Sequence, residues 1–594
     1  MNELLKNTFN NESEIYDSTT QYLLLSYDFL LQQAIEKIAK PSHASFRILD
    51  LGCGTGNLTK KIRKYYPNAT IYALDYSTAM LDRAIDKNIA GVKFIQRDMF
   101  DIEKEHLPLF DVIISSYVFH NFSSINEHER IIKLINEHLS IKGKFILVDL
   151  IDLIDIEKKK NYEASLTACM REHGLADEEI IKWMGILKIE DAPIPVELTS
   201  SILSANNFEN ITINPFDRFG SAVFTAEKKT DPVLLKSELL FSGLRENEIV
   251  KEIYLKQNPH DIWKTGNNGV FLSIMGLDAL LSINHKANKE SAYEIIKTGS
   301  NHILMKNKEV VTTDITVMSI PEWYNTPVGD FNFSKYFVFE GRRFLHLAYK
   351  GCAFSSNEKC KFCSTKRRTE GTDNSPDEII EAFRLAHKQM SADIQVCLGG
   401  GTYIPFSENV QYFFDIIQGI RKIDSDIPIW VEMIPPTIEE IDKLIDAGAT
   451  AFGFNIEIWN PEIRTMICPG KSQVSSKEYL DAMKHATTKL GSNRVGSCII
   501  VGLDSYDSVV EAIDILIDIG IEPCILPYKK YNRTNLGSYI IPDGYQSDFV
   551  RLSYYAARKA YERGVIFDNN QGCLNCACCT VMHDIQSKIK KGEI

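Results

Sequence analysis

A chain of 594 residues is long enough for roughly three or four domains, and its 44% of hydrophobic residues suffices for more than one core. The formal charge of −13 disfavours a nucleic-acid partner, which normally selects for a basic surface. No apolar run approaches the ~20 residues that span a bilayer, and the polar start shows no signal or transit peptide. We therefore expect a cytoplasmic protein without a membrane partner.

Thirteen cysteines are many for a cytoplasmic protein, and seven of them lie in two short arrays. In a reducing compartment such clustering predicts metal ligation and not disulfide bonds. The other six cysteines are predicted to be small buried hydrophobic residues. They are Cys53, Cys169, Cys397, Cys468, Cys498 and Cys524.

Residues 14–40 carry apolar and aromatic positions at helical spacing. Two interpretations stay open for this segment. It forms helices that pack on the following domain, or it forms a lid whose Tyr16 or Tyr22 lines a substrate pocket.

A glycine-rich loop comes next. An apolar strand at 46–51 runs into Gly52, Gly54 and Gly56 and then into a helix. Glycines let the backbone approach a ligand closely, and a helix N-terminus offers free N–H groups. A second strand ends in Asp75, where a carboxylate accepts hydrogen bonds from ribose hydroxyls. The pattern predicts a nucleoside cofactor, and NAD is the first candidate because the same geometry serves it.

The ordered motifs DLGCGTG, LDYS, FIQRDMFD and FDVIISSYVFHNF resemble the class I SAM-dependent methyltransferases. The resemblance extends from Tyr16 to Lys228, speaks against NAD and implies a Rossmann-like α/β fold. It also implies how S-adenosylmethionine (SAM) is held. The methionine part would contact Asp50, Gly52, Gly54 and Gly56, the ribose Asp75, and the adenine Asp98 and Met99.

His120 and Asn121 follow the predicted fourth strand of this domain. His120 is interpreted as a catalytic residue that orients or deprotonates the methyl acceptor. A structural role is the alternative, because methyl transfer to a good nucleophile needs little beyond positioning. Residues 151–203 interrupt the motif order and are expected to cover the substrate pocket. Apart from Lys158–Lys160 they show little charge clustering, which favours a small acceptor.

Composition turns polar before Pro232, which stops any continuing strand. We place the end of the first domain there, at residue 229. Residues 230–340 mix helical and strand-like stretches and predict a connecting α/β segment.

The first of the two cysteine arrays holds Cys352, Cys360 and Cys363 at C-x₇-C-x₂-C spacing. Three thiolates hold three irons of a [4Fe–4S] cluster and leave the fourth iron open. A zinc site is the alternative, but it needs a fourth ligand, and neither Cys nor His follows Cys363 closely. Strands and helices then alternate. They predict a partial (βα)6 barrel over residues 341–565, with its active site at the carboxyl ends of the strands.

The array and the strands after it resemble the radical SAM superfamily, although the commonest spacing there is C-x₃-C-x₂-C. The resemblance implies that the open iron binds a second SAM, whose cleavage yields a 5′-deoxyadenosyl radical. Gly399–Gly400–Gly401–Thr402 match the superfamily motif that contacts the amino group of SAM, although Gly401–Thr402 replace the acidic residue of that motif. Gly502 matches the superfamily motif on the adenine side of SAM. We expect a flavodoxin or ferredoxin as electron donor.

Glu432 and Glu457 end the third and fourth predicted barrel strands and are interpreted as ligands of the SAM ribose or of the substrate. Buried salt-bridge partners are the alternative. The tail, residues 566–594, holds four cysteines beside His583 and predicts a second iron–sulfur cluster or a zinc site, with redox thiols as the alternative. These cysteines are Cys573, Cys576, Cys578 and Cys579.

A narrower resemblance covers Leu235 to Asp584 and includes PEWYNTPVGD and NIEIWNPEIRTMICPGKS. These motifs are similar to a radical SAM family found in nitrilase-type gene clusters, and they imply no substrate. The whole pattern predicts a bifunctional enzyme of small-molecule biosynthesis. The alternatives are a radical SAM enzyme whose first domain only binds substrate or SAM, and a non-catalytic SAM- or iron-sensing module.

Overall fold

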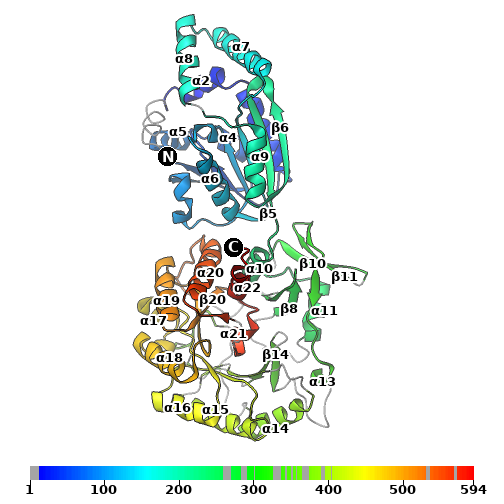
Figure 1. Ribbon diagram of the computed structural model, residues 1–594, viewed down its shortest axis with the longest axis vertical. Coiled ribbons are helices and arrows are strands. Elements are labelled where there is room, and N and C mark those ends of the chain that lie inside the picture. The colour runs from blue at the N-terminus through cyan, green and yellow to red at the C-terminus, as the bar shows by residue number, and fades with distance from the viewer. Residues whose placement is uncertain are drawn as a thin grey trace. The chain divides into compact units, whose positions relative to one another are not determined.

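The computed structural model describes sixteen stretches of the chain. They are residues 13–190, 192–257, 269–282, 291–299, 301–325, 336–340, 344–348, 352, 354–355, 357–363, 374–389, 395–399, 401–402, 405–529, 535–567 and 571–594. The chain divides into two compact units, Met1–Asp231 and Pro232–Ile594 (Figure 1). Unit 2 contains the predicted connecting segment, barrel and tail together.

Unit 1 is built on a seven-stranded sheet in the order β3-β2-β1-β4-β5-β7-β6. Strands β1 to β5 pair in parallel, whereas β7 runs antiparallel to both β5 and β6. This Rossmann-like sheet confirms the predicted α/β class. Its strands are β1 (Arg47–Leu51), β2 (Thr70–Asp75), β3 (Val92–Gln96), β4 (Phe110–Ser116), β5 (Leu139–Leu150), β6 (Phe208–Phe216) and β7 (Ser221–Lys228).

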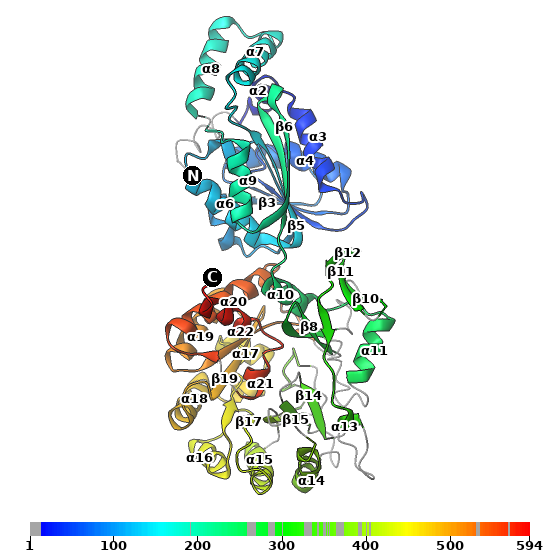
Figure 2. The same cartoon turned by 45° about the vertical axis from the view of Figure 1, so that its right-hand side comes forward.

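Helices cover both faces of the unit 1 sheet, because the buried runs of its parallel strands are apolar on both sides. Helices α3 (Tyr27–Ile38) and α4 (Asn57–Tyr65) pack on one face, and α6 (Ile125–His138) and α9 (Val196–Ala205) on the other (Figure 2). Helix α5 (Thr78–Asp86) follows β2.

Residues 151–203 contain two further helices, α7 (Ile156–Glu172) and α8 (Asp177–Glu190). In Figure 1 they project beyond the sheet beside α2 (Tyr16–Leu23). Leu166 and Met170 of α7 are buried against Leu25 and Tyr22 of the N-terminal segment. The insertion and the N-terminal helices therefore share one small core.

Unit 2 contains a second seven-stranded sheet, in the order β14-β15-β16-β17-β18-β19-β20. Strands β15 to β20 pair in parallel and β14 is antiparallel to β15. This parallel run is the sheet of the predicted barrel. Its strands are β14 (Phe337–Glu340), β15 (Phe344–Ala348), β16 (Gln395–Gly399), β17 (Ile429–Glu432), β18 (Ala451–Gly453), β19 (Val495–Val501) and β20 (Glu522–Pro527).

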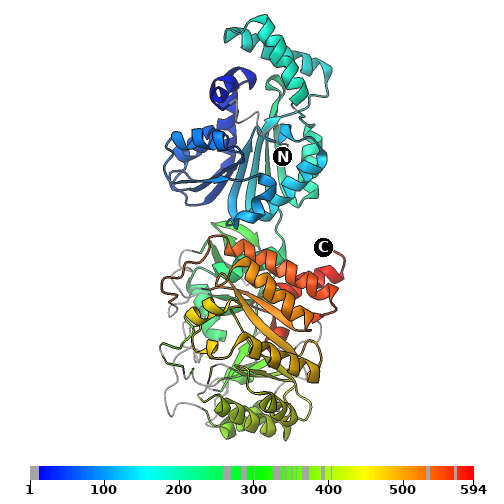
Figure 3. The ribbon, with the colours of Figure 1, turned by 90° about the vertical axis from the view of Figure 1, so that its left-hand side faces the viewer.

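From β15 onward, each strand is followed by one or two helices, which flank the sheet (Figure 3). Three of the helices start with a capping box, in which Ser375, Thr437 or Ser475 bonds a glutamate three residues on. The helices are α14 (Pro376–His387), α15 (Phe406–Arg421), α16 (Ile438–Ala447), α17 (Pro461–Ile467), α18 (Ser476–Leu490), α19 (Tyr506–Asp518) and α20 (Tyr545–Glu562).

The connecting segment forms two three-stranded sheets, β10-β11-β12 and β13-β8-β9, within unit 2. Their strands are β8 (Gly269–Ile274), β9 (Leu277–Ser282), β10 (Tyr293–Thr298), β11 (Asn301–Lys306), β12 (Glu309–Thr312) and β13 (Ile315–Val317). Helices α10 (Pro232–Ser242) and α11 (Glu248–Gln257) precede them, and α13 (Glu322–Asn325) follows. Lys236 of α10 forms an ion pair of 2.7 Å with Asp584, so this segment is tied to the tail.

The tail packs into unit 2 through α21 (Gly572–Cys576) and α22 (Met582–Lys590). Leu574 of α21 is buried in the same cluster as Cys397, Trp430 and Cys524, which lie on strands β16, β17 and β20. The Gly572 N–H donates to Gln395 Oε1 over 2.9 Å, at the first residue of β16. Helix α21 therefore packs against the parallel strands near their amino ends.

No helix in the parts of the chain that the structure describes is long and apolar enough to cross a membrane.

The contact of Gly572 with Trp430 gives a stability prediction. A Cβ at Gly572 would lie 2.1 Å from the Trp430 ring, and φ is +58°. Gly572→Ala is expected to lower the free energy of unfolding by about 1–3 kcal/mol, because the ring must move. Urea denaturation followed by circular dichroism measures this. Gly564→Ala is the matched control, since its φ of +75° imposes similar strain in open space. Equal losses in the two variants would contradict the packing argument.

Candidate active sites

A cavity of about 640 Å³ lies at the carboxyl ends of β1, β2 and β4 in unit 1. Active sites of open parallel sheets occur at such edges. The cavity is lined by Tyr16, Tyr27, Gly52, Cys53, Gly54, Thr55, Asn57, Leu58, Asp75, Tyr76, Met80, Met99, Ser116, Tyr117, Val118 and Asn121.

The glycine loop wraps around the end of β2. The Gly52 N–H donates to Leu74 O over 2.8 Å, and the Gly54 N–H donates to Asp75 Oδ2 over 2.8 Å. Gly52 has φ +76°, and a Cβ there would lie 2.5 Å from Val118 Cγ2. Glycine is therefore required at this position by conformation and by space.

Asp75 is almost fully buried, and burial raises its pKa although the N–H groups of Ser77 and Gly54 donate to the carboxylate. Each of its oxygens accepts one backbone N–H group. A carboxylate oxygen has lone pairs for a second donor, so Asp75 suits a ribose hydroxyl on the cavity side.

The other predicted SAM residues of unit 1 are distributed as follows. Met99 lines the cavity. Gly56 is the N-cap of α4, and Asp98 caps the 3₁₀-helix η1 (Met99–Glu105) by accepting from the Phe100 N–H over 3.0 Å. Asp50 is fully buried and does not line the cavity. Its carboxylate accepts the Thr59 hydroxyl over 2.5 Å, and burial raises its pKa to about 7.

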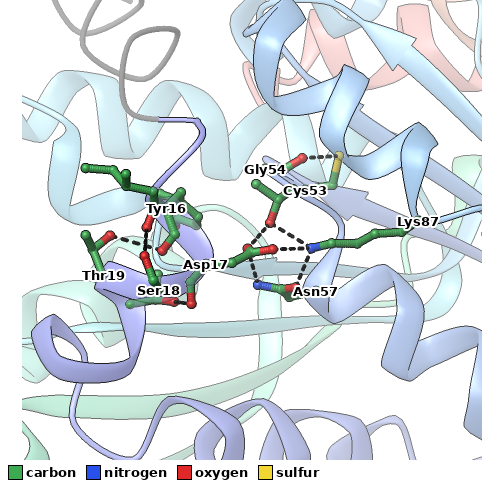
Figure 4. Close-up of polar contacts among 11 residues, drawn as sticks. Tyr16, Asp17, Ser18, Thr19, Cys53, Gly54, Asn57 and Lys87 are labelled. Atoms are coloured by element: carbon green, nitrogen blue, oxygen red, sulfur yellow. Dashed lines mark hydrogen bonds and ion pairs between the residues drawn. The ribbon is translucent and has the colours of Figure 1, made fainter. Parts of the chain in front are cut away.

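Polar contacts of Asp17 with Lys87, Thr55 and Asn57, which we call the latch, hold the N-terminal segment against the glycine loop (Figure 4). Asp17 of α2 forms an ion pair of 2.8 Å with Lys87 and accepts hydrogen bonds from Thr55 and Asn57 over 2.5 and 2.9 Å. Lys87 donates to the same Asn57 over 2.6 Å. Burial raises the pKa of Asp17, but these donors outweigh it and hold the pKa below its usual value.

Tyr16, the neighbour of Asp17, lines the cavity, whereas Tyr22 packs with Leu166 and Met170 of α7. Residues of α2 thus cover the cofactor cavity, as the lid interpretation expects of Tyr16. Asp17 and Lys87 belong to no sequence motif that predicts a site. The only local signal was a charged residue beside the cavity tyrosine.

His120 lies behind the cavity wall. Its Nδ1 is 2.5 Å from Asp149 Oδ1, and Asn121 Nδ2 is 3.2 Å from its Nε2. Because an amide nitrogen donates, His120 carries its proton on Nδ1, toward Asp149. Asn121 lines the cavity and His120 does not. The geometry therefore makes His120 a positioning residue for Asn121.

A second cavity, of about 930 Å³, lies in unit 2 at the carboxyl ends of β17 and β18. It brings together all three cysteines of the predicted cluster loop. Its lining residues are Cys352, Phe354, Lys359, Cys360, Phe362, Cys363, Gly401, Thr402, Glu432, Met433, Ile434, Asn455, Glu457 and Lys471.

The cysteine loop rests on the segment that follows α17. The Lys361 N–H donates to Ile467 O over 2.8 Å, and the Gly470 N–H donates to Glu358 O over 2.9 Å. A Cβ at Gly470 would lie 2.7 Å from the Phe354 ring, so glycine permits the close approach. The loop is therefore positioned by backbone contacts on both sides of Cys360.

The donor set fits an iron–sulfur cluster better than a zinc ion. Among the described residues, the ligand atoms within 4.8 Å of one another belong to Cys360, Glu457 and Cys468, a set that leaves out Cys352 and Cys363. Tetrahedral zinc with Zn–S bonds of about 2.3 Å draws its sulfurs to about 3.8 Å from one another. Three thiols spread around one cavity suit a larger polynuclear group.

Two carboxylates face these cysteines. Glu457 forms an ion pair of 2.9 Å with Lys471, and Glu432 accepts from Asn455 Nδ2 over 2.6 Å. Glu457 has φ +64°, a strained value for a non-glycine residue. Burial raises the pKa of Glu457 and Lys471 opposes that effect. Lys471 and Asn455 were not predicted as site residues from the sequence.

The glycines predicted to hold the second SAM are placed as follows. Gly399 ends β16, Gly401 and Thr402 line the cavity, and Gly400 lies outside the described residues. Gly502 follows β19 with φ +100° and does not line the cavity. A Cβ there would lie 2.8 Å from the Tyr545 ring.

The tail cysteines are placed as follows. Cys578 is buried in a cluster with Phe271 and Met318, and Cys576 packs against this cluster and against the cluster around Trp430. Cys579 is partly exposed, and the side chain of Cys573 lies outside the described residues. His583 Nε2 is 2.7 Å from Glu522 Oε1. Among the described side chains, no group of three close metal ligands includes a tail cysteine.

Comparison with known proteins assigns each unit separately. Residues 42–190 match the model of the family described as "Methyltransferase domain", and residues 348–516 match the model described as "Radical SAM superfamily". A malonyl-[acyl-carrier protein] O-methyltransferase of Bacillus cereus is 30% identical over 210 residues, which cover 34% of this chain and 74% of that protein.

Further relatives match unit 1 over shorter stretches. The corresponding Bacillus anthracis protein is 33% identical over 141 residues, 24% of this chain and 50% of the relative. A trans-aconitate 2-methyltransferase of an Acidovorax species is 44% identical over 69 residues, 11% of this chain and 26% of the relative. The crystal structure of human N-acetylserotonin methyltransferase in complex with SAM is 16% identical in sequence and superposes with a TM-score of 0.28. The matched region covers 38% of this chain and 57% of that chain.

The Asp17 latch gives a binding prediction. Asp17→Asn removes the charge that pairs with Lys87, so α2 should cover the cavity less of the time. We expect the Kd of S-adenosylhomocysteine for the first site to rise about 3- to 10-fold, equivalent to about 1 kcal/mol. Isothermal titration measures it. Asp28→Asn is the control, because Asp28 pairs with Lys61 on the exposed surface of α3. Equal affinity in both variants would show that the latch does not act on the ligand.

Proposed function

The chain belongs to the class I SAM-dependent methyltransferases through its first unit and contains a radical SAM domain in its second. We therefore propose that it is a bifunctional enzyme of small-molecule biosynthesis. The observation that carries the proposal is the presence of two cavities, one in each unit. Each lies at the carboxyl ends of parallel strands and is lined by residues that the sequence predicts to hold a cofactor.

In the first unit the proposed reaction is methyl transfer from SAM to a small acceptor. Gly52, Gly54 and Asp75 would hold the cofactor, and Tyr16 and Tyr27 would close the cavity over it. Water exclusion and orientation supply most of the rate enhancement that such a transfer needs.

We propose a carboxylate oxygen as the methyl acceptor. The malonyl-[acyl-carrier protein] and trans-aconitate enzymes that unit 1 resembles have names that identify acids as their substrates. A carboxylate is already ionised at neutral pH and needs no general base. This agrees with His120, whose two ring nitrogens are engaged by Asp149 and Asn121.

In the second unit we propose radical chemistry on an unactivated carbon of a small molecule. Cys352, Cys360 and Cys363 would hold a [4Fe–4S] cluster. The chemistry that such a cluster supplies with bound SAM is formation of a 5′-deoxyadenosyl radical. Glu432 and Asn455 would bind hydroxyl groups of the cofactor or the substrate, and Lys471 would keep Glu457 in place.

A one-electron carrier of the flavodoxin or ferredoxin class is the proposed partner, because the proposed [4Fe–4S] cluster must receive an electron before it can cleave SAM. The tail thiols are proposed to contribute either a second metal centre or packing. The resemblance to the family of nitrilase-type gene clusters supports a role in a biosynthetic pathway.

Two single variants test the two halves independently. Asp75→Ala should abolish S-adenosylhomocysteine formation with small dicarboxylic acids and leave 5′-deoxyadenosine formation intact. Cys360→Ala should do the reverse. Products are quantified by mass spectrometry after anaerobic incubation with SAM and dithionite. Asp28→Ala and Cys397→Ala serve as controls, since neither residue lines a cavity.

Persistence of S-adenosylhomocysteine formation in Asp75→Ala would show that the first cavity is not the methyl-transfer site. If wild-type protein releases 5′-deoxyadenosine but no S-adenosylhomocysteine with any acid offered, the first unit only binds SAM or substrate.

A further inference from the structure

Two cysteines from distant parts of the sequence meet on neighbouring strands of unit 2. Cys498 of β19 and Cys524 of β20 are direct partners in the parallel register. Their thiols are hydrogen-bonded to each other, and this bond, with burial, holds the pKa of Cys498 well above its usual value. The Cys498 thiol therefore keeps its proton and remains a neutral hydrogen donor at physiological pH.

The pairing geometry permits a disulfide bond. Paired strands lie about 4.8 Å apart, and disulfides form across Cα separations of roughly 4.4–6.8 Å. Both side chains face the same buried cluster as Trp430 and Leu574, so they point to the same side of the sheet. Cys397 belongs to that cluster too, but its strand partners are His346 and Trp430.

Cys498 adjoins the lining of the second cavity, and its thiol lies close enough to Glu432 and Glu457 for their charges to raise its pKa. The Cys498 N–H donates to Asn455 Oδ1 over 3.0 Å, and the Glu457 N–H donates to Cys498 O over 2.8 Å. Asn455 and Glu457 both line the cavity. Two residues along β19, Ile500 joins the cluster that contains Cys360. Cys498 is partly exposed and Cys524 is buried.

We propose that Cys498 and Cys524 are a redox-active thiol pair that donates a hydrogen atom to a carbon radical in the second cavity. This inference rests on the proposed radical chemistry of unit 2. Cys498 is the donor because it is the more exposed residue of the pair and its backbone bonds Asn455 and Glu457 of the cavity lining. Cys524 is its resolving partner.

The hydrogen transfer balances as follows. The carbon radical takes the hydrogen atom of the Cys498 S–H bond, so a C–H bond forms and a thiyl radical remains. The thiyl sulfur bonds to the Cys524 sulfur as Cys524 releases its proton to water. One electron leaves the pair for the oxidised form of a flavodoxin- or ferredoxin-class carrier. An external dithiol then supplies two electrons and two protons, which restore both thiols.

Thiol trapping on the full-length protein tests the pair without any substrate. The protein is equilibrated anaerobically in dithiothreitol buffers of graded redox potential, alkylated and digested for mass spectrometry. We expect a peptide linked through Cys498 and Cys524 to accumulate in the oxidising buffers while Cys397 stays alkylated. Absence of the linked peptide in the most oxidising buffer overturns the proposal.

Deuterium transfer tests the donor role. In D₂O, with SAM and dithionite but no substrate, the 5′-deoxyadenosyl radical itself is the carbon radical in the cavity. We expect deuterium in the 5′-deoxyadenosine, reduced at least about fivefold in Cys498→Ala and unchanged in Cys397→Ala. An equal deuterated fraction in all three proteins refutes the donor role.

The two experiments separate the inference from its premise. If no protein forms 5′-deoxyadenosine, the radical assignment of unit 2 and the donor role fail together. The trapping result then still decides whether Cys498 and Cys524 form a redox pair.

Discussion

Parallel strand pairing is the constraint on which both cavities depend. In a parallel sheet all carboxyl ends meet at one edge, so loops that are far apart in the sequence converge there. In unit 1 this convergence places the glycine loop, Asp75 and Asn121 around one cavity. In unit 2 it brings Glu432 and Asn455, which follow β17 and β18, to the cysteine loop. The apolar strands thus determine where the polar chemistry is assembled.

Residues that terminate a predicted strand or form a short motif were found from the sequence. Gly52 follows one apolar strand and Asp75 ends another, and Cys352, Cys360 and Cys363 share one loop. The Asp17–Lys87 latch and the Lys471–Glu457 ion pair were not predicted. Their partners come from separate elements, and a single charged residue on a helix normally indicates only a solvated face. Side-chain pairs of this kind become visible only once the elements are packed.

The predicted metal centre of the tail cysteines stays a prediction. Four cysteines lie within seven positions, and Cys576 and Cys578 share the cluster of Phe271 and Met318, while Cys576 also contacts the cluster around Trp430. By contrast with this local group, Cys498 and Cys524 are 26 positions apart and meet through strand register. Their contact follows from sheet topology, which the spacing of cysteines does not encode.

The presence of a SAM-binding cluster in unit 2 is tested most directly by low-temperature EPR spectroscopy. The protein is reconstituted anaerobically with iron and sulfide, reduced with dithionite, and measured with and without SAM. We expect a [4Fe–4S]⁺ signal whose shape changes when SAM is added, because SAM would bind the iron that Cys352, Cys360 and Cys363 leave open. A sample without a cluster, or a signal indifferent to SAM, would contradict the assignment of the second cavity to radical chemistry.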